Sequence, residues 1–369
     1  MHQRIISIPA ILTMGLGLVV ASCSSSSSTS ALTPEGGTPP GTDGGGPNPD
    51  GGPGPGMDGG PGGNDSGPGG NDSGNGGNDS GGNKDSGGGG KDSGSGGGHA
   101  IKTVFIIMEE NHNWSSIKGS SSAPYINNIL LPAGSYANNY KTPPGNHPSE
   151  PNYLWLEGGT NFNVTDDSDP AVNTINSTAH LVTLMKNAGV TWKAYVESAP
   201  SACPLTSGGL FAAKHTPQLF FDDVTNTLNP GAYCDSHIVD FSQLASDISA
   251  NTVAQYNFIT PNLVDDMHSG SIGAADSWLK TNIPMIQASS AYTNGGVILV
   301  IWDEGASSSD GPMGMIVVSS LSKGNGYSNN IAYTHSATLR TVQEIFSLSP
   351  FLGDAANGPD LSDLFKTFP

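Results

Sequence analysis

The chain has few positively charged residues for its length. Lysine and arginine together number 13 among 369 residues, against 32 aspartates and glutamates, so the formal net charge is −19. The excess of acidic over basic residues persists in residues 100–369, which carry 10 basic and 23 acidic residues. Such a surface repels nucleic-acid phosphates and anionic lipid headgroups. The charge balance therefore argues against nucleic acid as a partner and against electrostatic docking on a membrane.

The chain begins without an apolar run long enough to span a membrane comfortably. Arg4 supplies a positive start and residues 5–21 form a short apolar stretch, as in an export signal. The segment ends in Leu-Val-Val-Ala-Ser-Cys, which resembles the lipobox of bacterial lipoproteins, and the polar run after Cys23 favours that interpretation. We therefore expect Cys23 to be lipidated and to become the mature N-terminus. A plain secretory signal with an incidental cysteine is the alternative.

Residues 24–99 lack the apolar residues that a core requires. They consist mostly of Gly, Pro, Ser, Asn and Asp, and residues 1–99 hold 32 of the 52 glycines. A segment of this composition stays unfolded, so we interpret it as a flexible tether with a span of roughly 50 Å. The other 270 residues have ordinary glycine content and are long enough for one folded domain, 100–369.

Cysteine is scarce as well, with three residues in the whole chain. Setting Cys23 aside leaves Cys203 and Cys234, an even pair separated by 31 positions. We expect a disulfide between them, which persists only in an oxidising compartment. Two free buried thiols are the alternative. Export to the cell envelope and a disulfide are consistent with each other.

The folded part contains short apolar runs of the kind found in strands buried on both faces. These runs lie at residues 102–108, 190–196, 256–260, 297–302 and 315–318. Patterns of helical period occupy residues 179–187 and 339–346. Strands alternating with helices predict an α/β layered domain. In such sheets, ligands bind outside the carboxyl ends of the strands.

Polar residues follow three of these runs. They are Glu109 to His112, Asp265 to His268, and the pair Asp303 and Glu304. Carboxylates, an amide and imidazoles at one sheet edge suit a divalent cation. Each group alone is equally typical of solvated loops or helix caps. Their coincidence at three strand ends favours a metal site.

Several motifs together resemble the bacterial phosphoesterase family that contains acid phosphatases and phospholipases C. The motifs span nearly all of residues 101–348 in a matching order: residues 105–111, 146–153, 192–197, 214–217, 261–262 with 266–268, 302–304, and 333–335 with 339–341. The resemblance implies an alkaline-phosphatase-like layered α/β domain, with a mostly parallel central sheet flanked by helices. It also implies metal-assisted phosphoester hydrolysis through a covalent phosphoseryl intermediate.

The resemblance places a divalent metal ion on five residues and makes one of them the nucleophile. The ligands are Glu110, Asn111, Ser149, Asp303 and Glu304, and Ser149 is both ligand and nucleophile. A serine hydroxyl attacks a phosphoester poorly at neutral pH, but a bound cation lowers its pKa and offsets charge on the phosphate oxygens. Ser149 also lies between Pro148 and Pro151 at a predicted helix start, so a simple N-cap serine is the alternative.

The same resemblance assigns roles to several further polar residues. It makes His215, His268 and His335 catalytic, as donors to phosphate oxygens, proton-transfer groups or ligands of a second metal; a structural histidine is the alternative for each. His180, which precedes a predicted helix, is interpreted as a surface or capping residue. The expected substrate contacts are Asn111, His147, Glu197 and Asp266.

Some positions depart from the family pattern. Ser269 replaces a common aspartate, residues 305–311 lack the Asp-His found in many phospholipases C, and position 149 is serine rather than threonine. These departures favour an acid-phosphatase-like phosphomonoesterase acting on a small molecule or lipid headgroup. A phospholipase C-type phosphodiesterase is the alternative. A non-catalytic tethered surface-binding domain is a third reading, which the intact ligand set opposes.

The lipobox generates a prediction about location. We expect the protein to be exported and held on the bacterial cell envelope or surface by the lipid on Cys23. Cys23→Ser should therefore move the protein from membrane to soluble fractions, with unchanged activity per folded molecule. Cell fractionation followed by immunoblotting measures this. A variant that remains with the membrane would contradict the lipid anchor.

Overall fold

The computed structural model describes residues 98–306 and 311–369. The expected signal at residues 1–23, the lipidation of Cys23 and nearly all of the tether at 24–99 lie outside the described residues. Within the described part, no helix combines the length and apolar character needed to cross a membrane.

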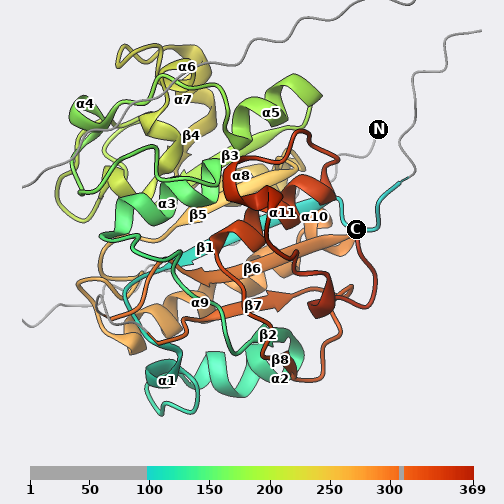
Figure 1. The fold of residues 1–369 in the computed structure, drawn as a ribbon. Coiled ribbons are helices and arrows are strands. Elements are labelled where there is room, and N and C mark those ends of the chain that lie inside the picture. Colours follow the sequence, from blue (N-terminus) through green and yellow to red (C-terminus); the bar gives the residue numbers. More distant parts are fainter. Residues whose placement is uncertain (1–97, 307–310) are drawn as a thin grey trace, which may run out of the picture. The chain divides into compact units, whose positions relative to one another are not determined.

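An eight-stranded sheet forms the centre of the domain (Figure 1). Its spatial order is β4-β3-β5-β1-β6-β7-β2-β8. The strands are β1 (Thr103–Glu109), β2 (Ser135–Ala137), β3 (Trp192–Val196), β4 (Ile238–Asp240), β5 (Tyr256–Thr260), β6 (Gly296–Trp302), β7 (Met315–Val318) and β8 (Tyr327–Asn329). Only the pairs of β7 with β6 and with β2 are antiparallel. The predicted α/β class with a mostly parallel sheet is confirmed.

Helices cover both faces of this sheet (Figure 1). They are α1 (Trp114–Ile117), α2 (Leu131–Ala133), α3 (Ser149–Gly158), α4 (Pro170–Asn173), α5 (Leu181–Ala188), α6 (Asp222–Thr225), α7 (Ala232–His237), α8 (Gln243–Ala250), α9 (Ile272–Gln287), α10 (Ser290–Thr293) and α11 (His335–Ile345). Helices α3 and α11 pack against each other on the front face, and α9 lies behind the sheet in the same view. Every residue of β1, β5 and β6 is buried, which explains their largely apolar sequences.

The predicted cysteine pair is bonded in the structure. Cys203 and Cys234 form a disulfide with their Cα atoms 5.6 Å apart. Cys234 belongs to α7, and Cys203 lies in the segment that follows β3. The bond therefore joins two surface segments at the β3–β4 side of the sheet.

His180 is the N-cap residue of α5, as one of its two interpretations had it, but it is not a surface residue. Its exposed fraction is 0%. Its Nδ1 lies 3.0 Å from Glu157 Oε1 in α3, and its Nε2 lies 2.9 Å from Asp223 Oδ1 in α6. The ring also stacks on Phe221 at 3.8 Å between centroids. His180 thus ties three helices together, a contact that its sequence position alone does not indicate.

The charge state of His180 makes this contact depend on pH. Burial by itself lowers the pKa of His180, but the hydrogen bonds to Asp223 and Glu157 outweigh burial and raise the pKa above its usual 6.5. A raised pKa means that protonated His180 stabilises the fold below the unfolded-state pKa. That stabilisation is lost as the pH rises through the folded-state pKa.

We therefore predict a pH-dependent loss of stability in His180→Phe, which keeps the ring but removes both nitrogens. The free energy of unfolding should fall by about 3–5 kcal/mol at pH 5, because two carboxylates lose their buried partner. The difference from wild type should shrink toward pH 9. Urea denaturation at both pH values measures it.

His237→Phe is the matched control. His237 stacks near Trp192, and its pKa is lowered by burial, so its contribution should not decline as the pH rises. A His180→Phe effect of equal size at pH 5 and pH 9 would show that His180 is neutral in the folded protein.

Candidate active site

The carboxyl ends of three adjacent strands carry the candidate site. Glu110 directly follows β1, Asp303 directly follows β6, and Asp266 lies in the loop after β5. Since β1 is paired with both β5 and β6, these three carboxylates reach one edge of the sheet. Backbone hydrogen bonds fix the edge: Glu110 N–H donates to the Asp266 carbonyl at 2.8 Å, and Asp303 N–H donates to the Glu109 carbonyl at 3.0 Å.

Ser149 lies against this edge as the first residue of α3. Its side chain is almost fully buried, and its Oγ donates to Glu110 Oε2 at 3.2 Å. Pro148 directly precedes the helix, and Pro151 falls in its first turn, where proline is tolerated. The proposed nucleophile and the first proposed metal ligand are therefore in direct contact.

Asn111 and Glu304 complete the group that the sequence predicts to hold metal. Asn111 N–H donates to Asp303 Oδ1 at 3.2 Å. With its amide nitrogen turned toward them, the Asn111 side chain lies 3.0 Å from Glu110 Oε2 and 3.3 Å from Glu304 Oε1. Asn111 has a φ of 45°, a left-handed conformation that asparagine tolerates better than most residues. All five predicted ligands thus form one connected group.

Burial of several carboxylates together makes this group electrostatically unusual. Burial raises the pKa of Glu110 well above its usual value, and the nearby Asp303 and Asp266 raise it further. Burial also raises the pKa of Asp303 and of Asp266 to about 7. Such a concentration of buried negative charge is costly without a compensating cation.

The donor chemistry of the group fits a divalent cation. Three carboxylates, one amide and one hydroxyl offer the oxygen ligands that hard cations prefer. Asp303 Oδ2 is buried and has no hydrogen-bond partner, which leaves it available as a ligand. The residues present therefore fit a divalent metal ion.

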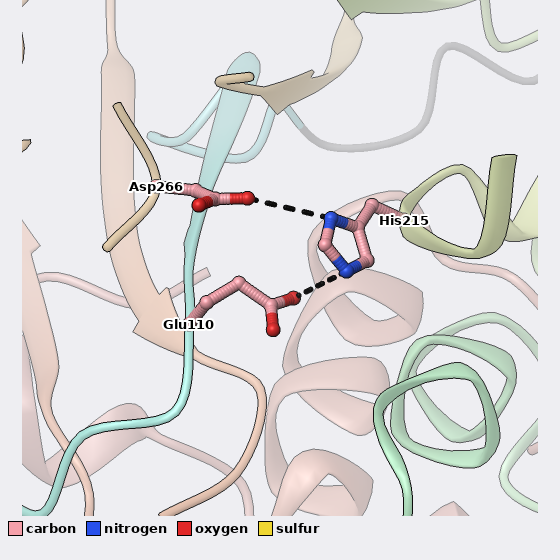
Figure 2. Close-up of side chains that lie close together, drawn as sticks. All are labelled: Glu110, His215 and Asp266. Atoms are coloured by element: carbon pink, nitrogen blue, oxygen red, sulfur yellow. Dashed lines mark ion pairs between the residues drawn. The ribbon is translucent and has the colours of Figure 1, made fainter. Parts of the chain in front are cut away.

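His215 lies between two of the carboxylates (Figure 2). Its Nε2 is 3.1 Å from Glu110 Oε1, and its Nδ1 is 3.4 Å from Asp266 Oδ2. One ligand atom from each of these three buried residues lies within 4.8 Å of the others, a second arrangement compatible with a metal. Burial lowers the pKa of His215 well below 6.5, so the ring is neutral. Two of the predicted roles, His215 as catalytic and Asp266 as substrate-binding, therefore fall on residues beside Glu110.

His335 takes a different place from the one expected for a phosphate donor. Its Nε2 lies 2.5 Å from the Asp303 carbonyl, and its Nδ1 lies 3.0 Å from the Tyr140 hydroxyl. The ring is fully buried, and burial lowers the pKa of His335 to about 4. Because both nitrogens already have partners, His335 positions the backbone of Asp303 rather than facing substrate.

His268 and His147 lie at the more open side of the group. His268 is exposed, and its ring centroid is 5.8 Å from that of His215. The His147 side chain is 28% exposed, and its Nδ1 lies 2.7 Å from Glu304 Oε2. Both residues are therefore more accessible to solvent than the buried carboxylates.

Glu197 is not part of this group. Its Oε2 accepts the Asn262 N–H at 3.0 Å, and its Oε1 accepts Trp278 Nε1–H at 3.1 Å. These contacts brace the loop between β5 and α9, which carries Asp266. The sequence motif identified Glu197, but the structure gives it a supporting contact instead of the expected substrate contact.

Four residues that the sequence did not single out also shape the site. Tyr153 donates to Glu110 Oε1 at 2.5 Å and stacks on His215, and Asn152 Nδ2 donates to Glu304 Oε2 at 3.2 Å. Lys214 Nζ lies 2.6 Å from Asp167 Oδ2. Asn152, Tyr153 and Lys214 occur within the quoted motifs, which is the signal that identifies them. Asp167 has no such signal.

Comparisons of sequence link the chain to phosphoester hydrolases. Residues 138–311 match the model of the Phosphoesterase family. A phosphatidylinositol-3-phosphatase of Mycobacterium tuberculosis is 31% identical over 265 residues, covering 71% of this chain and 82% of that protein. A probable acid phosphatase of Kluyveromyces lactis is 29% identical over 215 residues, covering 56% of this chain. The chain spans about half the length of that fungal relative, 48%.

Two solved structures among those that match the chain have the following scores. An alkaline phosphatase superfamily protein from Vibrio parahaemolyticus has a TM-score of 0.47 and 10% identity, with 72% of each chain covered. A phosphonate monoester hydrolase from Silicibacter pomeroyi has a TM-score of 0.47 and 11% identity, covering 73% of this chain and 77% of that one.

Proposed function

Because this chain belongs to the Phosphoesterase family and is a phosphoester hydrolase, we propose that it is a metal-dependent phosphomonoesterase with a phosphoserine intermediate. The observation that carries this proposal is the contact between Ser149 Oγ and Glu110 Oε2, 3.2 Å, inside a group of oxygen ligands. A hydroxyl held against a buried carboxylate at a sheet edge is suited to nucleophilic attack.

The divalent cation in this proposal is held by Glu110, Asn111, Ser149, Asp303 and Glu304. When bound, it lowers the pKa of the Ser149 hydroxyl and offsets negative charge on the phosphate oxygens. His335 and Tyr140 keep Asp303 in place through the Asp303 carbonyl, and Asn152 and His147 hold Glu304. These supporting contacts pre-organise the oxygen ligands before substrate arrives.

The reaction then proceeds in two displacements. Ser149 Oγ attacks phosphorus and gives its proton to Glu110, while the bond from phosphorus to the leaving alcohol breaks. His268, at the open side, protonates the departing alkoxide. In the second displacement a water molecule attacks the phosphoserine and gives a proton to His268, the bond from phosphorus to Ser149 Oγ breaks, and Ser149 takes back its proton from Glu110 as inorganic phosphate leaves.

Preference for a monoester rests on the sequence departures at Ser269 and residues 305–311, and on the names of the relatives. The relatives are named a phosphatidylinositol-3-phosphatase and a probable acid phosphatase, and these names support release of phosphate from a monoester. The alternative is a phosphodiesterase of phospholipase C type, which parallel assays with mono- and diesters distinguish. The reading as a non-catalytic binding domain is disfavoured, because every proposed ligand is present and connected.

We further propose that the enzyme acts outside the cytoplasm, attached by a lipid on Cys23. The disulfide between Cys203 and Cys234 supports an oxidising compartment. A phosphoester-containing small molecule or a lipid headgroup would then be the substrate within reach of the tether.

The first prediction from this mechanism concerns Ser149. Ser149→Ala should lower kcat by about a thousandfold or more, because the two-step route is no longer available. Acid quench of wild-type enzyme during turnover should trap phosphate on the peptide containing Ser149. Ser336→Ala is the control. Ser336 is also a buried serine, but its hydrogen bonds are with Trp155 and Asp354 and not with residues of the site.

The stereochemistry of transfer at phosphorus can contradict the phosphoserine mechanism. Two displacements leave the configuration at a chiral phosphorus centre retained when phosphate is transferred to an added alcohol. Inversion would mean a single displacement by water, with Ser149 at most a ligand.

The second prediction concerns the metal. Chelation should abolish hydrolysis while the protein stays folded, and an added divalent cation should restore wild-type activity but not that of Asp303→Asn. Metal analysis of the purified proteins should find less bound metal in Asp303→Asn than in Asp247→Asn, whose aspartate pairs with Lys193 away from the site. Full activity of the chelated enzyme would exclude the mechanism.

A further inference from the structure

Lys214 lies beside the candidate site but has no part in the mechanism above. It directly precedes His215 in the short 3-10 turn at Ala213–His215. Its Nζ is 2.6 Å from Asp167 Oδ2, and its side chain is 15% exposed. The other oxygen of Asp167 accepts the backbone N–H of Glu150 at 3.0 Å, and Glu150 follows Ser149. The ammonium group and the first turn of α3 therefore converge on the same carboxylate.

We propose, on the basis of the proposed function, that Lys214 binds the phosphoryl oxygens of the substrate. In this role Lys214 makes the site prefer a phosphomonoester dianion over a phosphodiester monoanion. Asp167 is the partner that holds the ammonium group until phosphate takes its place.

The charge of the site explains why such a residue is needed. Glu110, Asp266, Asp303 and Glu304 are all buried, so an incoming dianion meets strong repulsion that a monoanion feels less. Lys214 adjoins these groups, because it directly precedes His215, whose Nε2 lies 3.1 Å from Glu110 Oε1 and whose Nδ1 lies 3.4 Å from Asp266 Oδ2. Lysine offers a compact charge on a flexible stem, which suits a phosphate that arrives and leaves.

The ion pair between Lys214 and Asp167 is suited to replacement by a contact between Lys214 and phosphate. Both side chains are partly exposed, 15% for Lys214 and 30% for Asp167, and such ion pairs cost little to break. Two donors, Lys214 Nζ and Glu150 N–H, already surround an anionic group there. A phosphate oxygen can therefore replace one carboxylate oxygen without rebuilding the surroundings.

The chain offers a matched control in Lys193. Its Nζ lies 2.7 Å from Asp247 Oδ2, and its side chain is 20% exposed, so the pair resembles that of Lys214 and Asp167. Lys193 belongs to β3 and also contacts Tyr195, away from Ser149. Loss of its charge tests the general effect of breaking a partly exposed ion pair.

The experiment compares Lys214→Met, Lys214→Arg and Lys193→Met in the metal-loaded protein. It measures kcat/KM for an aryl phosphomonoester and for an aryl methyl phosphodiester, and the Kd of inorganic phosphate by calorimetry. In Lys214→Met, the monoester-to-diester ratio should fall about tenfold and the phosphate Kd should rise about tenfold. Lys214→Arg should recover part of the monoester-to-diester ratio and part of the phosphate affinity. Lys193→Met should change neither quantity.

Asp167→Asn tests the exchange with phosphate separately. Asparagine keeps an oxygen for the Glu150 N–H but removes the charge that competes for Lys214. The phosphate Kd should therefore fall severalfold. A phosphate Kd that rises in Asp167→Asn as it does in Lys214→Met would overturn the inference, because the pair would then act only as a structural unit.

The outcomes separate this inference from the proposed function. An unchanged phosphate Kd in Lys214→Met, or equal losses for monoester and diester, would overturn the role of Lys214 while leaving the hydrolase mechanism in place. A wild-type protein that binds phosphate through Lys214 but hydrolyses neither ester would overturn the proposed function and leave the phosphate-binding role standing.

Discussion

The site depends on the contacts that the Glu110 carboxylate makes. Its two oxygens accept hydrogen bonds from Ser149 and Tyr153, and one of them also faces His215. Glu110 can occupy this central place because it follows β1, which lies between β5 and β6 in the sheet. The loops after the neighbouring strands then bring Asp266 and Asp303 to the same point. A shift of β1 would separate all of these groups at once.

The surrounding structure offsets the cost of gathering buried carboxylates. Backbone donors hold Asp303 and Asp266, and the neutral His335 contacts the Asp303 carbonyl through its Nε2. Glu197 and Trp278 brace the loop of Asp266. The site therefore combines a rigid oxygen-rich interior with a more open side that carries His268, His147 and Lys214. Rigidity suits metal binding, and exposure suits exchange of substrate and phosphate.

The roles of the histidines could not be predicted from the sequence. Three of the histidines are buried but have different partners. His180 lies between Glu157 and Asp223. His215 contacts Glu110, and His335 contacts the backbone carbonyl of Asp303. Each of these partners is distant in sequence, so spacing along the chain cannot distinguish a structural histidine from one at the site. Glu197 was misplaced for the same reason, since its partners Asn262 and Trp278 lie in another segment.

The sequence by itself determined the α/β class, the positions of the buried strands β1, β3, β5, β6 and β7, and the polar residues at the carboxyl ends of β1, β5 and β6. These features are local, because buried strands need continuous apolar residues and the residue after such a strand necessarily reaches the sheet edge. Only the tertiary structure decided which polar groups meet. The pairing of Lys214 with Asp167, and of both with the first turn of α3, depends on how loops pack over the sheet, and no short-range pattern in the chain encodes that packing.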